Sequence, residues 1–167
     1  MSTWADFLQN LADSRVGTSI HESGIAFAWI ESLHVLMVVI VVGSIAIVDL
    51  RLLGYRSHRR GARQLMTDLL PFTWGAFTLA VVTGGSLFTS QAPSYWESVP
   101  FRLKMAVLLL AGVNMAIFHM TAYRKIVEWD DASLPPLVVR IAGATSLCLW
   151  IVIIFLGRWI GFSVPFA

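Results

Sequence analysis

Charged residues are scarce in this chain. Only 13% of its 167 residues are charged, whereas 57% are hydrophobic. Because soluble domains carry about 25% charged residues, this composition excludes an ordinary soluble protein and indicates an integral membrane protein. The small net charge of +2 comes from basic residues that flank apolar segments. That pattern is typical of membrane topology, so no nucleic-acid partner is expected.

Cysteine is nearly absent, which limits the available chemistry. The single cysteine, Cys148, lies inside an apolar run, so one chain offers neither a disulfide nor a thiolate-rich metal site. The sequence also lacks a glycine-rich nucleotide loop, paired carboxylates spaced for acid and base catalysis, and a nucleophile with a base. Soluble enzyme chemistry is not expected, and whether the protein is an enzyme stays open.

Long apolar runs make up much of the chain. They are too long for strands and none alternates with period two. The length of 167 residues supplies about four spans of roughly 20 residues, with nothing left for a second domain. We therefore predict one all-α domain over residues 1–167, an integral membrane four-helix bundle. The predicted spans are about residues 24–50, 69–90, 101–123 and 138–157, with Pro71 in the first turn of the second.

The ends of these spans predict the topology. Five arginines crowd the loop after the first span, whereas residues 91–100 contain no basic residue. By the positive-inside rule the arginine loop is cytoplasmic, which places both termini in the periplasm of a bacterial inner membrane. Residues 1–17 lack the features of a signal peptide, and their apolar residues recur at helical spacing. They are predicted to form a short amphipathic helix on the lipid surface.

An acid and a histidine stand at the start of the first apolar run. Glu31 and His34 are one helical turn apart on the same face, and Met37 continues that face. An ionisable pair within a membrane helix is a candidate functional site. Because ligating histidines usually donate their second ring N–H to a carboxylate or carbonyl, Glu31 is expected to orient His34.

A second polar group lies on the third span, where Asn114, Met115 and His119 fall within about one turn. Imidazole and thioether groups suit both haem iron and Cu(I). The first and third spans run parallel, and their residue positions put His34 and His119 about 15 Å apart along the membrane normal. One haem therefore does not easily take both as axial ligands. Two sites, or a purely structural His119, remain open.

Several short motifs carry a family resemblance. They are Glu31-x-x-His34 with Gly43, Val48 to Gly54, Pro71 to Trp74, Thr83-Gly84, Tyr95, Phe101 to Lys104, and Asn114 with His119. This pattern resembles an uncharacterised family of small bacterial four-span membrane proteins. More loosely, it resembles the copper-resistance D type membrane domain and the small membrane protoporphyrinogen oxidase of haem synthesis.

The oxidase resemblance implies a cofactor and its ligands. His34, Gly43 and Lys104 match a first-span histidine, a glycine about nine residues on and a lysine opening the third span of a protein that binds haem b. The resemblance implies that His34 is a haem ligand and that Lys104, with Arg102, lies near a propionate. It does not transfer the oxidase activity, because Glu31 and Trp74 belong to the uncharacterised family alone.

Four functions are compatible with these residues. The leading one is a haem b binding membrane protein that transfers electrons between the membrane and a partner protein. The alternatives are a copper or small-ion protein that uses His34, Met37, Met115 and His119, an accessory subunit that anchors a larger membrane complex, and the oxidase itself. The small residues of the second span, among them Gly75 and Gly85, are compatible with internal packing or with a homo-oligomer.

Overall fold

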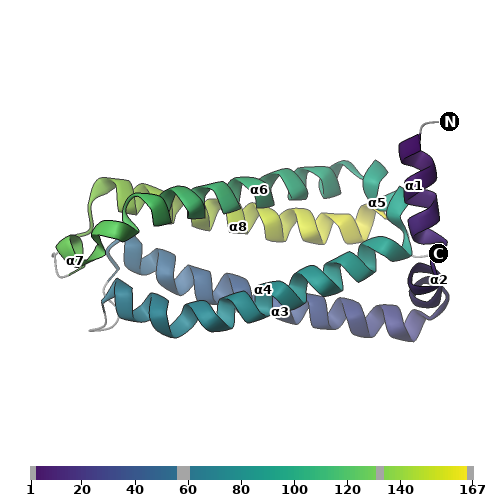
Figure 1. Cartoon of the computed structure of the whole chain (residues 1–167), viewed down its shortest axis with the longest axis horizontal. Helices are drawn as coiled ribbons and strands as arrows, with labels where there is room; N and C mark the ends of the chain where they lie inside the picture. Colours follow the sequence, from purple (N-terminus) through teal and green to yellow (C-terminus); the bar gives the residue numbers. More distant parts are fainter. Residues whose placement is uncertain (1–2, 56–60, 131–133, 165–167) are drawn as a thin grey trace.

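The structure is a computed structural model that describes residues 3–55, 61–130 and 134–164, and four long helices dominate it (Figure 1). These are α3 (Gly24–Leu52), α4 (Ala62–Ser90), α6 (Val99–Met120) and α8 (Leu137–Ser163). Each belongs to a stretch long and apolar enough to cross a membrane. The described residues form no strand. The predicted all-α four-helix membrane bundle is confirmed.

Short helices close the two ends of the bundle. At the terminal end, where both chain termini lie, are α1 (Thr3–Ala12), α2 (Arg15–Glu22) and α5 (Ala92–Glu97) (Figure 1). At the opposite end, the loop end, are the 3-10 helix η1 (Tyr123–Lys125) and α7 (Ile126–Trp129). The even number of crossings explains why both termini share one end.

The N-terminal segment forms two helices rather than the predicted single one. Ser14 interrupts the helix because its hydroxyl oxygen accepts a hydrogen bond of 3.1 Å from the backbone N–H of Gly17, the usual contact of an N-cap residue. Gly17 then packs so tightly that an added Cβ would lie 2.8 Å from the carbonyl oxygen of Thr89. The second helix, α2, is thereby held against α4.

The second long helix also begins earlier than the predicted span. Helix α4 starts at Ala62, seven residues before residue 69, so Pro71 lies inside the helix and not in its first turn. The prediction for Pro71 was wrong. The early start is explained by Asp130, whose carboxylate accepts hydrogen bonds from the backbone N–H groups of Ala62 and Arg63. This cap comes from a residue far along the chain.

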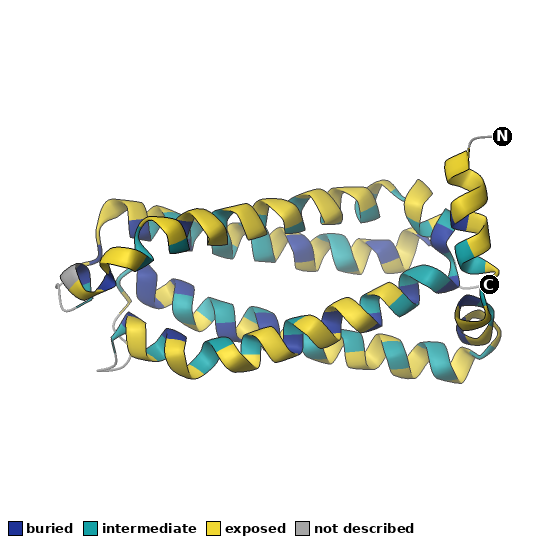
Figure 2. Cartoon of the chain, viewed as in Figure 1, coloured by how far each residue is buried: buried dark blue, intermediate teal, exposed yellow. Residues whose placement is uncertain are grey.

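The long helices are arranged as two pairs. Helix α3 packs against α4, α8 packs against α6, and the contact of α3 with α8 joins the pairs. Helices α4 and α6 make no extensive contact in the described part of the chain. Exposed apolar side chains cover the outside of the bundle, including Trp29, Phe72, Leu109 and Phe155 (Figure 2). A surface of this kind is stable against lipid rather than water.

The main cluster of buried apolar residues lies at the loop end. It contains Leu52, Ala62, Met66, Phe118, Ile126, Trp129 and Val139. The indole N–H of Trp129 donates a 2.9 Å hydrogen bond to the carbonyl oxygen of Ala122, which ties α7 to the end of the third span. The loop end is therefore a firmly packed base for the four long helices.

Candidate functional site

His34 lies in the third turn of α3, half-buried and turned toward α4. Its Nδ1 atom is 3.0 Å from the carbonyl oxygen of Ala80 and 3.0 Å from the hydroxyl oxygen of Thr83. Gly84 makes room for the ring, since an added Cβ there would lie only 2.8 Å from the Cε1 atom of His34. The ring is thus fixed in position by three residues of the neighbouring helix.

These contacts determine which nitrogen of the neutral ring carries the proton. The carbonyl oxygen of Ala80 can only accept, so the Nδ1 atom must donate. The hydroxyl of Thr83 donates to the carbonyl oxygen of Leu79 at 2.7 Å, so its oxygen remains an acceptor for the same N–H. A neutral His34 with its proton on Nδ1 has a free lone pair on Nε2. This is the form in which an imidazole binds a metal.

Glu31 does not orient His34. Within the described residues no hydrogen bond or ion pair joins them, and Glu31 is exposed on α3. The expectation that Glu31 accepts a hydrogen bond from the ring of His34 and orients it was wrong. The Nδ1 atom of His34 contacts Ala80 and Thr83 instead. Burial, and secondly the negative charge of Glu31, raise the pKa of Tyr95 above its ordinary value. Glu31 therefore lies near α5 at the terminal end.

Lys104 approaches His34 from α6, on the other helix pair. Its side chain is half-buried, and its Nζ atom would lie 3.5 Å from a Cβ added at Gly157 of α8. It is close enough to His34 for an electrostatic interaction between them. No carboxylate of the described residues forms a salt bridge with Lys104. The fold therefore brings together an imidazole and an amine from residues 70 positions apart in the sequence.

Arg102 is exposed on the first turn of α6. No described hydrogen bond or salt bridge connects its side chain to His34 or Lys104. Of the two basic residues, it is Lys104 that interacts electrostatically with the histidine. The two basic residues have different surroundings even though the resemblance pairs them.

His119 is separate from His34. It lies in the last turn of α6, where its Nδ1 atom is 2.9 Å from the carbonyl oxygen of Met115 and its ring packs against Tyr123. Both α3 and α6 start at the terminal end (Figure 1), and His34 lies ten residues into its helix whereas His119 lies twenty into its own. That offset corresponds to about 15 Å along the bundle. The two histidines occupy different depths.

Other predicted site residues serve packing or face outward. The amide of Asn114 donates a 3.1 Å hydrogen bond to the carbonyl oxygen of Ala142 on α8. Gly43 is exposed, and a Cβ there would meet nothing within 4 Å. In the described ranges no group of three or more His, Cys, Asp and Glu side chains is gathered as a metal site would need. His34 is thus the predicted ligand with the best-defined surroundings.

The small residues of α4 do not act as one face. Gly84 packs against His34, whereas Gly75 and Gly85 have open space where a Cβ would be. Sequence reasoning missed that Thr83 and Gly84 form part of the site. The signal was present, because a hydroxyl residue followed by glycine in a membrane helix can bond and accommodate a partner side chain.

A comparison with protein families identifies the family to which the chain belongs. A model of the family of unknown function DUF6644 matches residues 11–163, nearly the whole sequence. The chain belongs to this family. Searches of curated proteins and of solved structures gave no match. The matched region includes all four long helices, His34 and its partners on α4.

Proposed function

We propose that this protein binds haem b through His34 and transfers electrons between the membrane and a partner protein. The observation that supports this best is the fixed ring of His34. Its Nδ1 atom is held by Ala80 and Thr83, and its Nε2 atom keeps a free lone pair. Ligating histidines usually have their second nitrogen anchored in this way. The bound haem would supply one-electron chemistry, because its iron cycles between two oxidation states.

The surroundings of His34 also fit a group with negative charges. Lys104 is a half-buried amine in a membrane helix without a carboxylate partner in the described residues. A cation in such a place is usually paired or functional. Lys104 would hold a propionate, and Arg102 would approach the same group from the exposed side. The helix pairs α3/α4 and α6/α8 would then contribute to one binding site from both sides.

The looser resemblances support the same proposal. His34 and Lys104 match the histidine and lysine positions of the haem-binding oxidase, and copper remains the alternative ligand that the copper-resistance resemblance implies. The separation of His34 from His119 favours a site with one histidine of this chain. Within this chain, His34 would then be the histidine that holds the haem.

The absorption spectrum of the detergent-purified protein tests this proposal. We expect a Soret band and, in the pyridine haemochrome, the bands of haem b. Retention of copper without a haem spectrum would favour the copper alternative. If neither haem nor copper is retained, even after expression with haem precursor and copper supplied, the proposal is wrong and an anchoring subunit is the better interpretation.

We further propose that the loop end faces the cytoplasm of a bacterial inner membrane and that both termini face the periplasm. Among the described residues, basic side chains are more numerous at the loop end (Arg51, Arg63, Arg124, Lys125 and Arg140) than at the terminal end (Arg15, Arg102 and Arg158). This distribution follows the positive-inside rule. Binding partners would then meet the His34 side of the bundle from the periplasm.

Cysteine labelling in intact cells tests the orientation. In a Cys148→Ser background, a cysteine at Ser19 of α2 should react with an impermeant maleimide, whereas one at exposed Arg124 should react only after the cells are opened. A cysteine at Ser57, which lies outside the described residues, should behave like the one at Arg124. Labelling of the Arg124 position in intact cells, with the Ser19 position protected, would reverse the orientation.

A further inference from the structure

Asp49 is a carboxylic acid enclosed by the protein near the loop end of α3. Only 5% of its surface is exposed. The enclosure results from a close approach of α8, where a Cβ added at Gly143 would lie 3.0 Å from the carbonyl oxygen of Asp49 and 3.0 Å from the Cβ atom of Leu52. The packing of α3 against α8 therefore leaves little of Asp49 accessible to water.

The polar surroundings of Asp49 are incomplete. The hydroxyl of Ser146, three residues beyond Gly143 on α8, is the polar side chain that interacts with the carboxyl group. The Oδ2 atom of Asp49 is buried and has no hydrogen-bond partner in the part of the chain that the structure describes. Buried carboxyl oxygens that serve only packing are nearly always satisfied. The unsatisfied oxygen therefore points to a ligand.

No cation in the described part of the chain forms a salt bridge with Asp49. On its own helix, the guanidinium of Arg51 binds Asp130. On α8, Arg140 lies six residues before Ser146, about 9 Å further toward the loop end, and its Nε atom is also buried without a partner. On α4, the charged residue at this level, Asp68, is exposed and negative. Among the described residues Asp49 forms no salt bridge.

A buried carboxylate without a paired cation is strongly disfavoured, so such groups are neutralised. The simplest neutral form of Asp49 carries a proton on the unsatisfied Oδ2 atom and keeps the contact with Ser146. We propose that Asp49 is a reversible proton-binding site at the loop end of the bundle. The binding is a proton transfer between the carboxyl group and water, with no other reactant. This inference does not depend on haem at His34.

Reaction with dicyclohexylcarbodiimide tests the proposal, because this apolar reagent enters membranes and adds to protonated carboxyl groups. The wild-type protein in liposomes should form an adduct that tandem mass spectrometry maps to Asp49. The adduct yield should fall at least about tenfold as the pH rises and Asp49 loses its proton. Asp49→Asn should lose this adduct, and the matched control Asp68→Asn should retain it.

The wild-type mapping needs no variant, so the test holds even if Asp49→Asn fails to fold. The infrared C=O stretch of a protonated acid gives a second readout without reagent access, and it should disappear at high pH in the wild type. A carboxyl group at Asp49 that stays ionised, or stays protonated at every pH, would overturn the proposal. So would protection of Asp49 by sodium or potassium ions at constant pH, because the ligand would then be a metal cation.

Discussion

Replacing His34 with alanine should abolish haem binding while the bundle remains folded. The Nδ1 atom of His34 is anchored by Ala80 and Thr83 of the neighbouring helix, which leaves a lone pair on Nε2, so the substitution removes the proposed iron ligand. The fold should survive because the side chain is only half-buried and four long apolar helices still pack. The ratio of Soret absorbance to protein should fall at least about tenfold, with an unchanged gel-filtration profile.

His119→Ala is the matched control for this prediction. His119 bonds its own helix through the carbonyl oxygen of Met115 and lies about 15 Å from the depth of His34. Its replacement should leave the haem content nearly unchanged. If His34→Ala retained all its haem and His119→Ala lost it, the cofactor would lie at the loop end, and the assignment of His34 would be wrong.

Variants of the orienting residues refine the same experiment. Thr83→Val keeps the shape of the side chain but removes the hydroxyl that contacts the ring of His34. Replacing such an orienting partner usually weakens metal binding by roughly 10- to 100-fold. Ala80 still accepts from the ring, so the lower part of this range is expected. Glu31→Gln should change haem affinity much less, since the structure gives Glu31 no bond to His34.

The fold could be predicted from composition because membrane helices follow from long apolar runs alone. The start of α4 could not. No residue near Ala62 in the sequence marks a cap with its side chain, and the backbone N–H groups there are satisfied by Asp130, 68 positions away from Ala62. Such a contact between distant segments leaves no local pattern in the sequence.

For the site, the sequence was enough to select His34 as a candidate but not to identify its hydrogen-bond partners. The position of His34 inside an apolar run was enough to select it as a candidate. The prediction that Glu31 is the partner of His34 was wrong. A spacing of three residues places both on the same face of the helix, but it does not determine which way either side chain turns. The contact of α3 with α4 decides this, and it turns the ring of His34 toward Ala80 and Thr83.

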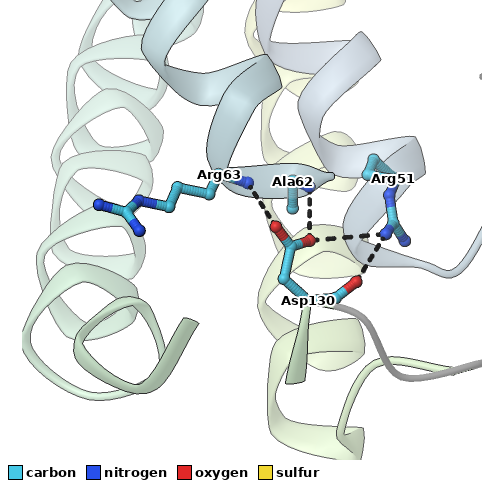
Figure 3. Close-up of polar contacts among 4 residues, drawn as sticks. All are labelled: Arg51, Ala62, Arg63 and Asp130. Carbon is cyan, nitrogen blue, oxygen red and sulfur yellow. Dashed lines mark hydrogen bonds and ion pairs between the residues drawn. The ribbon is translucent and has the colours of Figure 1, made fainter. Parts of the chain in front are cut away.

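The largest expected effect on stability comes from Asp130, which joins three helical segments at the loop end (Figure 3). Its carboxylate caps α4 through Ala62 and Arg63, and one of its oxygens is 3.5 Å from the guanidinium of Arg51. The side chains of Arg51 and Asp130 are only 9% and 14% exposed. Asp130→Ala would therefore remove a helix cap and break the ion pair between Asp130 and a largely buried guanidinium.

We expect Asp130→Ala to lower the free energy of unfolding by roughly 4 kcal/mol, since breaking a buried ion pair costs about 3–5 kcal/mol and losing a cap costs about 1 kcal/mol. The estimate stays at the lower end because Arg51 keeps its 3.1 Å hydrogen bond to the backbone oxygen of Asp130.

Asp130→Asn should cost less, because an amide oxygen can still cap α4. Thermal unfolding in detergent measures both variants, with Glu97→Gln, an exposed residue of α5, as the control. An unfolding temperature of Asp130→Ala equal to that of Glu97→Gln would show that this ion pair and cap do not hold the loop end together.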